Sequence, residues 1–89
     1  MREPYYPKQF DRDVRLQKKR GKDAEKLRVI LQFLVEEKTL PEKAGDHSLS
    51  GNFSGYRECH IDPDWLLIYK LEEAAVYFVR TGTRSDLFG

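Results

Sequence analysis

The sequence predicts a single domain of the α+β class, with two N-terminal helices packed on one face of a small, mainly antiparallel sheet. Two observations support this class. Apolar residues recur at helical spacing in the first half of the chain, and short apolar or alternating segments separated by turn residues fill the second half. A chain of 89 residues is long enough for one modest core, so we expect residues 1–89 to form one domain.

A short strand and a helix are predicted at the start of the chain. The prolines in "REPYYP" limit the opening segment to a short edge strand, because proline cannot donate a hydrogen bond to a central ladder. Within residues 8–20, Phe10 and Val14 lie four positions apart with charged residues between them. This spacing predicts a helix with a narrow apolar stripe.

A second helix is predicted after Gly21, which breaks the first. Asp23 is suited to cap its N-terminus, and the helix is expected to end near Lys38, before Pro41. Its apolar residues follow at helical spacing: Leu27, Ile30, Leu31, Leu34 and Val35. Two consecutive helices joined by a short link that contains glycine form an αα-hairpin.

Three strands are predicted in the second half of the chain. The segment "PEKAGDHSLSGNFSGY" is rich in glycine and serine and is expected to be a loop. "YRECHI" alternates like a strand, Pro63 marks a turn, "WLLIYKL" is apolar enough to be central, and "VYFVRTG" is the last strand. The short connections between them favour an antiparallel three-stranded meander.

Charge is distributed unevenly along the chain, although the net charge is only +1. Residues 1–28 contain ten Lys and Arg against five Asp and Glu, whereas residues 29–89 contain six against ten. Lys18, Lys19 and Arg20 belong to the densest basic run. A basic patch of this kind can follow the phosphates of a nucleic acid; the alternative is a solvated helix face.

The composition argues against several other classes of protein. No segment approaches the ~18 consecutive apolar residues of a membrane span, and the start of the chain lacks the apolar run of a signal peptide. A cytoplasmic location without membrane contact is therefore expected. Cys59 is the only cysteine, which rules out an internal disulfide and a cysteine-based zinc finger within one chain. By alternation, Cys59 is expected to point into the core.

Ionisable residues gather around the turn that contains Pro63. His60 and Asp64 flank this turn; a histidine can exchange a proton near neutral pH, and a nearby carboxylate can orient its ring. Trp65 offers a surface for base stacking, and Arg80, at the end of the last strand, is suited to bind a phosphate. A base, an acid, a cation and an aromatic surface are what metal-free RNA cleavage requires.

Structural roles for these residues remain open. His47, in the predicted loop, could be an ordinary surface residue, His60 could cap a backbone carbonyl, and Trp65 could belong to the core. A metal site formed by His47, His60 and Asp64 is a further alternative, although the spacing of these residues matches no short-range zinc signature.

Two segments resemble a known family. "DHSLSGNFSGYRECHIDPDWLLIYKL" and "FVRTGTRSDLFG" closely resemble the YafQ-type toxins of bacterial type II toxin–antitoxin modules, which belong to the RelE/ParE superfamily. The resemblance is strong over residues 46–89, and the helical first half agrees with a RelE-like layout. It implies a ribosome-dependent endoribonuclease, active without a metal or other cofactor, that cuts mRNA in the ribosomal A site by attack of the ribose 2′-hydroxyl and so inhibits translation.

The resemblance also implies roles for individual residues and a partner protein. The expected catalytic residues are His47, His60, Asp64, Arg80 and Arg84. The expected substrate-binding residues are Trp65, Phe88 and the basic residues Lys18, Lys19 and Arg20. The partner would be a small RelB- or DinJ-like antitoxin that forms a ribbon-helix-helix dimer, and operator DNA would be contacted only through the complex of toxin and antitoxin.

Arg84 departs from the family pattern, in which this position is usually histidine. Arginine stays protonated and cannot shuttle a proton near neutral pH, although it can stabilise charge on a phosphate. We therefore expect this chain to cleave more slowly than an Arg84→His variant. The alternatives are a catalytically inactive member that acts as a binding or repressor subunit, a gyrase-inhibiting toxin of the same superfamily, and a metal-dependent hydrolase.

Overall fold

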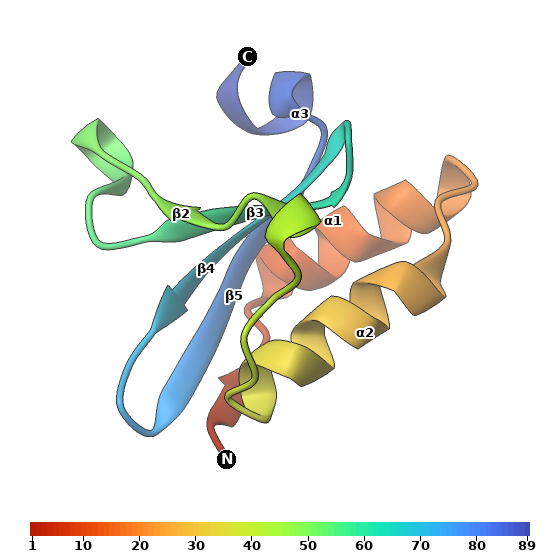
Figure 1. Ribbon diagram of the computed structural model, residues 1–89. Helices are drawn as coiled ribbons and strands as arrows, with labels where there is room; N and C mark the ends of the chain where they lie inside the picture. The colour runs from red at the N-terminus through yellow and green to blue at the C-terminus, as the bar shows by residue number, and fades with distance from the viewer.

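The computed structural model describes residues 1–89 and has two long helices on one face of a five-stranded sheet (Figure 1). The strands are β1 (Glu3–Tyr5), β2 (His47–Ser48), β3 (Arg57–Asp62), β4 (Trp65–Leu71) and β5 (Ala75–Gly82). They lie in the order β1-β5-β4-β3-β2. β1 runs parallel to β5, and the other neighbouring strands are antiparallel. The predicted α+β class and the three-stranded meander are therefore confirmed.

The helices are α1 (Lys8–Lys19), α2 (Ala24–Val35) and α3 (Arg84–Phe88), and the 3₁₀ turns η1 (Glu42–Ala44) and η2 (Gly51–Phe53) precede β3. As predicted, the side chain of Asp23 caps α2 by accepting a backbone N–H of its first turn. Gly21, with a φ of 86°, makes the turn between the two long helices. α2 ends at Val35 rather than near Lys38, and Glu37 beyond it has a left-handed φ of 60°.

The hydrophobic core lies between the long helices and the sheet. Its buried members are Phe10, Leu34, Ala44, Cys59, Leu67, Tyr69, Val76 and Phe78. The ring centroids of Phe10 and Phe78 are 5.9 Å apart, which joins α1 to β5. The prediction that Cys59 points into the core is confirmed, and burial raises the pKa of its thiol to about 12.

An irregularity in β5 decides which way its last residues point. Tyr69 pairs with Phe78 but Ile68 pairs with Arg80, so β5 carries one extra residue, Val79, at this place. Because side chains alternate along a strand, the shift moves Arg80 off the face that carries Phe78. Arg80 is therefore in register with Ile68, and its guanidinium reaches Asp13 of α1 at the edge of β5.

Two elements, β2 and α3, are absent from the sequence-based expectations. β2 lies in the segment expected to be a loop, and its two residues are too few to show alternation. α3 is capped by Thr83, whose side chain accepts the backbone N–H of Asp86 while the Asp86 carboxylate accepts the N–H of Thr83. The letters "TRSD" carry this capping-box signal, so α3 was predictable. None of the helices has both the length and the apolar character needed to span a bilayer.

Candidate active site

Three of the expected catalytic residues, His47, His60 and Arg80, are carried by different strands of the sheet. The pairing register places His47 beside Glu58, Glu58 beside Ile68, and Ile68 beside Arg80. These four residues form a row across β2, β3, β4 and β5. By alternation, His60 shares the face of Glu58 on β3. The sheet therefore places residues of β2, β3 and β5 in one row, with β3 and β4 between His47 and Arg80.

Glu58 is the point at which this row meets α3. Its side chain is only 1% exposed, and Oε1 accepts a hydrogen bond from Nη2 of Arg84 at 2.9 Å. Nε2 of His47 lies 3.6 Å from the same oxygen. The other oxygen, Oε2, is buried without a hydrogen-bond partner. A buried carboxylate that is only partly satisfied is costly, and here it holds an arginine beside a histidine.

The ring of His47 is oriented from both sides. Nδ1 lies 2.9 Å from the carbonyl oxygen of Gly45. Because a carbonyl oxygen can only accept, Nδ1 carries a proton and Nε2 faces the Glu58 carboxylate. When Nε2 is also protonated, His47 has an anionic partner. The arrangement is therefore suited to supply a proton.

His60 is oriented by a backbone carbonyl and not by a carboxylate. Its Nδ1 lies 3.3 Å from the carbonyl oxygen of Pro63, as in the alternative in which His60 caps a carbonyl. Asp64 is exposed in the turn between β3 and β4. The two residues lie at the same end of the sheet, and the catalytic role of each stays a prediction.

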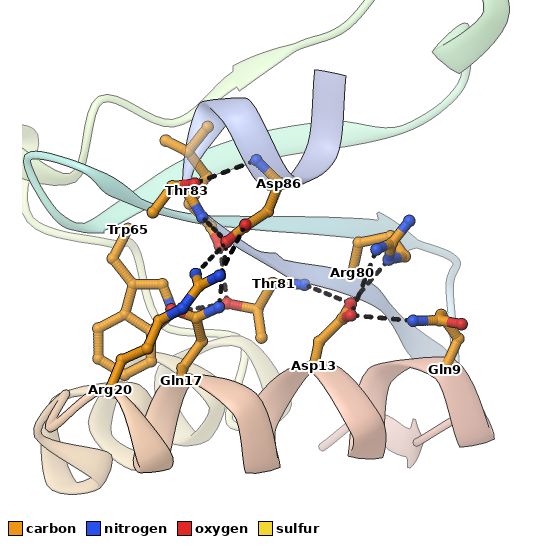
Figure 2. Close-up of polar contacts among 10 residues, drawn as sticks. Gln9, Asp13, Gln17, Arg20, Trp65, Arg80, Thr81, Thr83 and Asp86 are labelled. Carbon is orange, nitrogen blue, oxygen red and sulfur yellow. Dashed lines mark hydrogen bonds and ion pairs between the residues drawn. The ribbon is translucent and has the colours of Figure 1, made fainter. Parts of the chain in front are cut away.

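Arg80 is held at the edge of β5 by a buried aspartate from α1 (Figure 2). Asp13, 6% exposed, accepts hydrogen bonds from Nε and Nη2 of Arg80 at 2.7 and 3.2 Å. The same carboxylate accepts the backbone N–H of Thr81 and the side-chain amide of Gln9. The hydrogen bonds with Asp13 raise the pKa of Arg80. About a third of the Arg80 side chain stays exposed, which leaves a fixed cation within reach of solvent.

Trp65 lies in the core and has no ring face open to a base. It is 1% exposed, and its Nε1–H donates to Oγ1 of Thr81 at 2.9 Å (Figure 2). Thr81 in turn donates to the carbonyl oxygen of Leu66. The expectation that Trp65 contacts substrate directly is therefore corrected: this residue joins β4 to the end of β5 from inside the fold, in agreement with the core alternative.

Phe88 is the exposed aromatic residue of this region. It is 40% exposed, and the guanidinium carbon of Arg84 lies 5.3 Å from its ring centroid. The ring of Phe53 meets it edge-on at 5.5 Å. Arg84 is thus held by the Phe88 ring and by Glu58, and substrate binding by Phe88 stays a prediction.

The basic run at the end of α1 has two different environments. Lys18 and Lys19 are exposed. Arg20 instead binds the carboxylate of Asp86 on α3 through Nη1 and Nη2, at 2.6 and 3.1 Å. The guanidinium of Arg20 is therefore already paired within the chain. The sequence-based expectation was that this guanidinium would contact ribosomal RNA.

Sequence reasoning misses Glu58 and Asp13, the two buried acidic residues that hold Arg84 and Arg80. In both cases the spacing in the sequence indicates on which face the side chain lies. Glu58 precedes His60 by two positions in an alternating strand, so the two side chains share a face. Asp13 follows the core residue Phe10 at helical spacing, which places it on the buried side of α1.

The structure gives no support to a metal site at these residues. No group of three or more His, Cys, Asp or Glu side chains is arranged to hold a metal ion. The side chains of His47, His60 and Asp64 are therefore not arranged as the ligands of one metal ion.

The fold and the site together define a RelE-like toxin: a small mixed sheet, two helices on one face, a histidine and an arginine that meet on a buried glutamate, and an exposed aromatic residue beside that arginine. Residues 2–89 match the family model described as bacterial toxin of type II toxin-antitoxin system, YafQ. The chain belongs to the YafQ toxin family. The resemblance noted in the sequence is thereby confirmed.

Individual relatives agree with this assignment. The chain is 46% identical over 86 residues to the mRNA interferase toxin YafQ of Escherichia coli K12. The matched segment covers 94% of this chain and 92% of the relative. It is 43% identical to the crystal structure of YafQ from E. coli BL21(DE3), with a TM-score of 0.95 and full coverage of both chains. The E. coli DinJ–YafQ complex matches with a TM-score of 0.93, at 43% identity and full coverage. The expected class of enzyme, an endoribonuclease, is the one named for the curated relative.

Proposed function

We propose that this chain, a toxin of a type II toxin–antitoxin system, is a ribosome-dependent endoribonuclease that cuts mRNA in the ribosomal A site and so inhibits translation in the cytoplasm. The observation that carries the proposal is the meeting of His47 and Arg84 on Glu58, in one row with Arg80. The name of the E. coli relative, an mRNA interferase, supports the substrate class.

The reaction needs no nucleophile from the protein. The ribose 2′-hydroxyl gives its proton to a base and its oxygen attacks the adjacent phosphorus. The bond from phosphorus to the 5′-oxygen breaks, and that oxygen takes a proton from an acid, leaving a 2′,3′-cyclic phosphate and a 5′-hydroxyl. Each proton transfer by a positioned side chain typically contributes about 10²–10⁴-fold to the rate.

The roles of the residues follow from their surroundings. His47, whose Nε2 faces a carboxylate, is assigned as the acid. His60 is assigned as the base, with Asp64 nearby to assist. Arg80 and Arg84 stabilise the charge that grows on the phosphate, and their ion pairs with buried carboxylates fix them before the substrate arrives.

The proposed protein partner is an antitoxin. The E. coli relative has been solved in complex with DinJ. We infer that this chain binds a RelB- or DinJ-like antitoxin that forms a ribbon-helix-helix dimer, and that operator DNA is contacted only through the complex. Co-expression with a neighbouring short reading frame is expected to abolish growth arrest and to give a complex that co-purifies.

Single-turnover cleavage of mRNA on programmed ribosomes tests the nuclease function. Arg80→Ala and His60→Ala are expected to lower the rate at saturating ribosome at least about a hundredfold. The measurement is made with and without a chelator of transition metals, at a Mg²⁺ concentration that keeps the ribosome assembled, and the rate is expected to be the same. Absence of cleavage by the unmodified chain, or an unchanged rate in Arg80→Ala, would refute the proposal.

Induction in living cells separates the alternatives. Translation arrest that disappears in His60→Ala supports the nuclease. A DNA damage response in place of translation arrest would point to the gyrase-inhibiting branch. No growth arrest by the unmodified chain would point to an inactive binding subunit. In the assay on programmed ribosomes, loss of cleavage with the chelator of transition metals would point to a metal-dependent hydrolase.

A further inference from the structure

The short helix α3 carries Arg84 and Phe88 but has few anchors of its own. It spans five residues, and none of them is buried. A helix of this length is not held by its backbone hydrogen bonds alone, because nucleation of a helix is unfavourable. The position of α3 therefore depends on contacts between its side chains and the rest of the fold.

One carboxylate makes several of these contacts (Figure 2). Asp86 accepts hydrogen bonds from Nη1 and Nη2 of Arg20 at 2.6 and 3.1 Å. It also accepts the side-chain amide of Gln17 at 3.2 Å and the backbone N–H of Thr83 at 2.9 Å. Gln17 is 1% exposed, so Asp86 is tied to the buried side of α1 as well as to the start of its own helix.

The end of β5 leaves room for this carboxylate. A β-carbon at Gly82 would lie 2.9 Å from Oδ2 and 3.0 Å from Cβ of Asp86, which is closer than a side chain tolerates. The hydrogen bonds from Arg20, and after them that from Thr83, hold the pKa of Asp86 well below its usual range. Asp86 is therefore charged at neutral pH and pairs with Arg20 as an ion.

We propose that Arg20 and Asp86 are positioning residues for the cleavage site: their ion pair latches α3 to α1 and so sets where Arg84 and Phe88 stand. The catalytic consequence rests on the proposed nuclease function, whereas the latch itself is a property of the fold. The inference reassigns Arg20 from a contact with ribosomal RNA to an internal tie.

Backbone dynamics test the latch without reference to activity. NMR order parameters of residues 84–88 are expected near ~0.85 in the unmodified chain and below ~0.6 in Arg20→Ala, the values of rigid and flexible backbone. Arg15→Ala is the matched control, because it removes an exposed arginine from the same helix and leaves Asp86 untouched. Unchanged order parameters of α3 in Arg20→Ala overturn the proposal.

Single-turnover cleavage then distinguishes positioning from RNA binding. Arg20→Ala is expected to lower the rate at saturating ribosome roughly tenfold to a hundredfold, the cost of a small displacement at a reacting centre. The salt dependence of ribosome binding should stay unchanged. Arg20→Lys, which keeps one charged donor, should recover part of the rate. The double variant Arg20→Ala/Asp86→Ala should be no slower than Asp86→Ala alone, because the two residues act as one unit.

A direct RNA contact gives the opposite pattern. In that case Arg20→Ala weakens ribosome binding and lowers its salt slope by about one, while the rate at saturation stays normal; this result overturns the proposal. If the unmodified chain cleaves no mRNA at all, the proposed function fails, and the order parameters of α3 alone decide whether the latch exists.

Discussion

Arg84 stands at the position where the resemblance to YafQ-type toxins leads us to expect a histidine. It donates to Glu58 at 2.9 Å and lies over the ring of Phe88. Because its guanidinium stays protonated, it can stabilise charge but cannot release a proton. We expect Arg84→His to raise the single-turnover cleavage rate on programmed ribosomes by about tenfold to a hundredfold, since a further group for proton transfer becomes available. Equal rates for the two proteins would contradict this expectation.

The carboxylate of Glu58 is buried with one oxygen bonded and the other without a partner. Glu58→Gln keeps the shape and removes the charge. We expect the cleavage rate to fall roughly tenfold, because Arg84 and His47 lose the anion between them. The free energy of unfolding should be unchanged or higher by up to about 1 kcal/mol, because burying a charge is costly. Urea unfolding and cleavage are measured on the same preparation; lower stability with an unchanged rate would assign Glu58 a structural role only.

The thiol of Cys59 is fully buried, and burial raises its pKa to about 12. We expect no reaction of the folded protein with a thiol-specific reagent at pH 8 and complete reaction in urea, because the thiolate is the reactive form. The folded pKa lies above the unfolded value of roughly 8.5, so the stabilising contribution of the protonated thiol is present below that pH and declines as pH rises. A Cys59→Val variant should lack this decline between pH 8 and 9.5 in urea unfolding.

The contact between α1 and the end of β5 depends on Asp13. This residue accepts hydrogen bonds from Arg80, Gln9 and the backbone N–H of Thr81. Asp13→Asn is expected to lower the free energy of unfolding by about 1–3 kcal/mol, the usual cost of disturbing a buried charge-assisted network, and to slow cleavage because Arg80 is released. Urea unfolding is compared with that of Asp11→Asn, an exposed acid on the same helix. An equal loss in both variants would show that the effect is not specific to the network.

The helices and strands differ in how well their own residues predict them. α1 and α2 form where the spacing of apolar residues predicts them, and Asp23 caps α2 as expected. The apolar segment at β4 is central in the sheet, as expected. β2 has only two residues, and its existence depends on pairing with β3. Elements with an internal period are therefore predictable, whereas an element defined by its partner is not.

Charge is unevenly distributed over the molecule as a whole, and the surplus of basic residues lies in residues 1–28. Lys18 and Lys19 are exposed at the end of α1. We expect the double variant Lys18→Ala/Lys19→Ala to weaken ribosome binding and to lower the salt slope of the affinity by about one to two. The cleavage rate at saturating ribosome should stay the same. A slower saturating rate with an unchanged salt slope would argue that these lysines act on the chemical step.

Burial explains why part of the site could not be predicted residue by residue. Trp65 has the chemistry of a stacking surface but is covered on all sides. Arg20 has the chemistry of a phosphate ligand but is already paired with Asp86. In both cases the residue type indicates what the side chain is able to bind, but its actual partner, Thr81 for Trp65 and Asp86 for Arg20, lies on another element of the fold.

Periodicity, turn residues and short motifs are properties of adjacent residues, so the α+β class, the helical hairpin, the meander and the family could be read from the chain alone. Packing was needed for the rest. Arg80 pairs with Ile68, in one row with His47 and Glu58, because one extra residue in β5 shifts the register after Phe78. His47 and Arg84 meet on Glu58 because strand pairing and the path of α3 bring them there, and contacts between distant segments leave no local pattern.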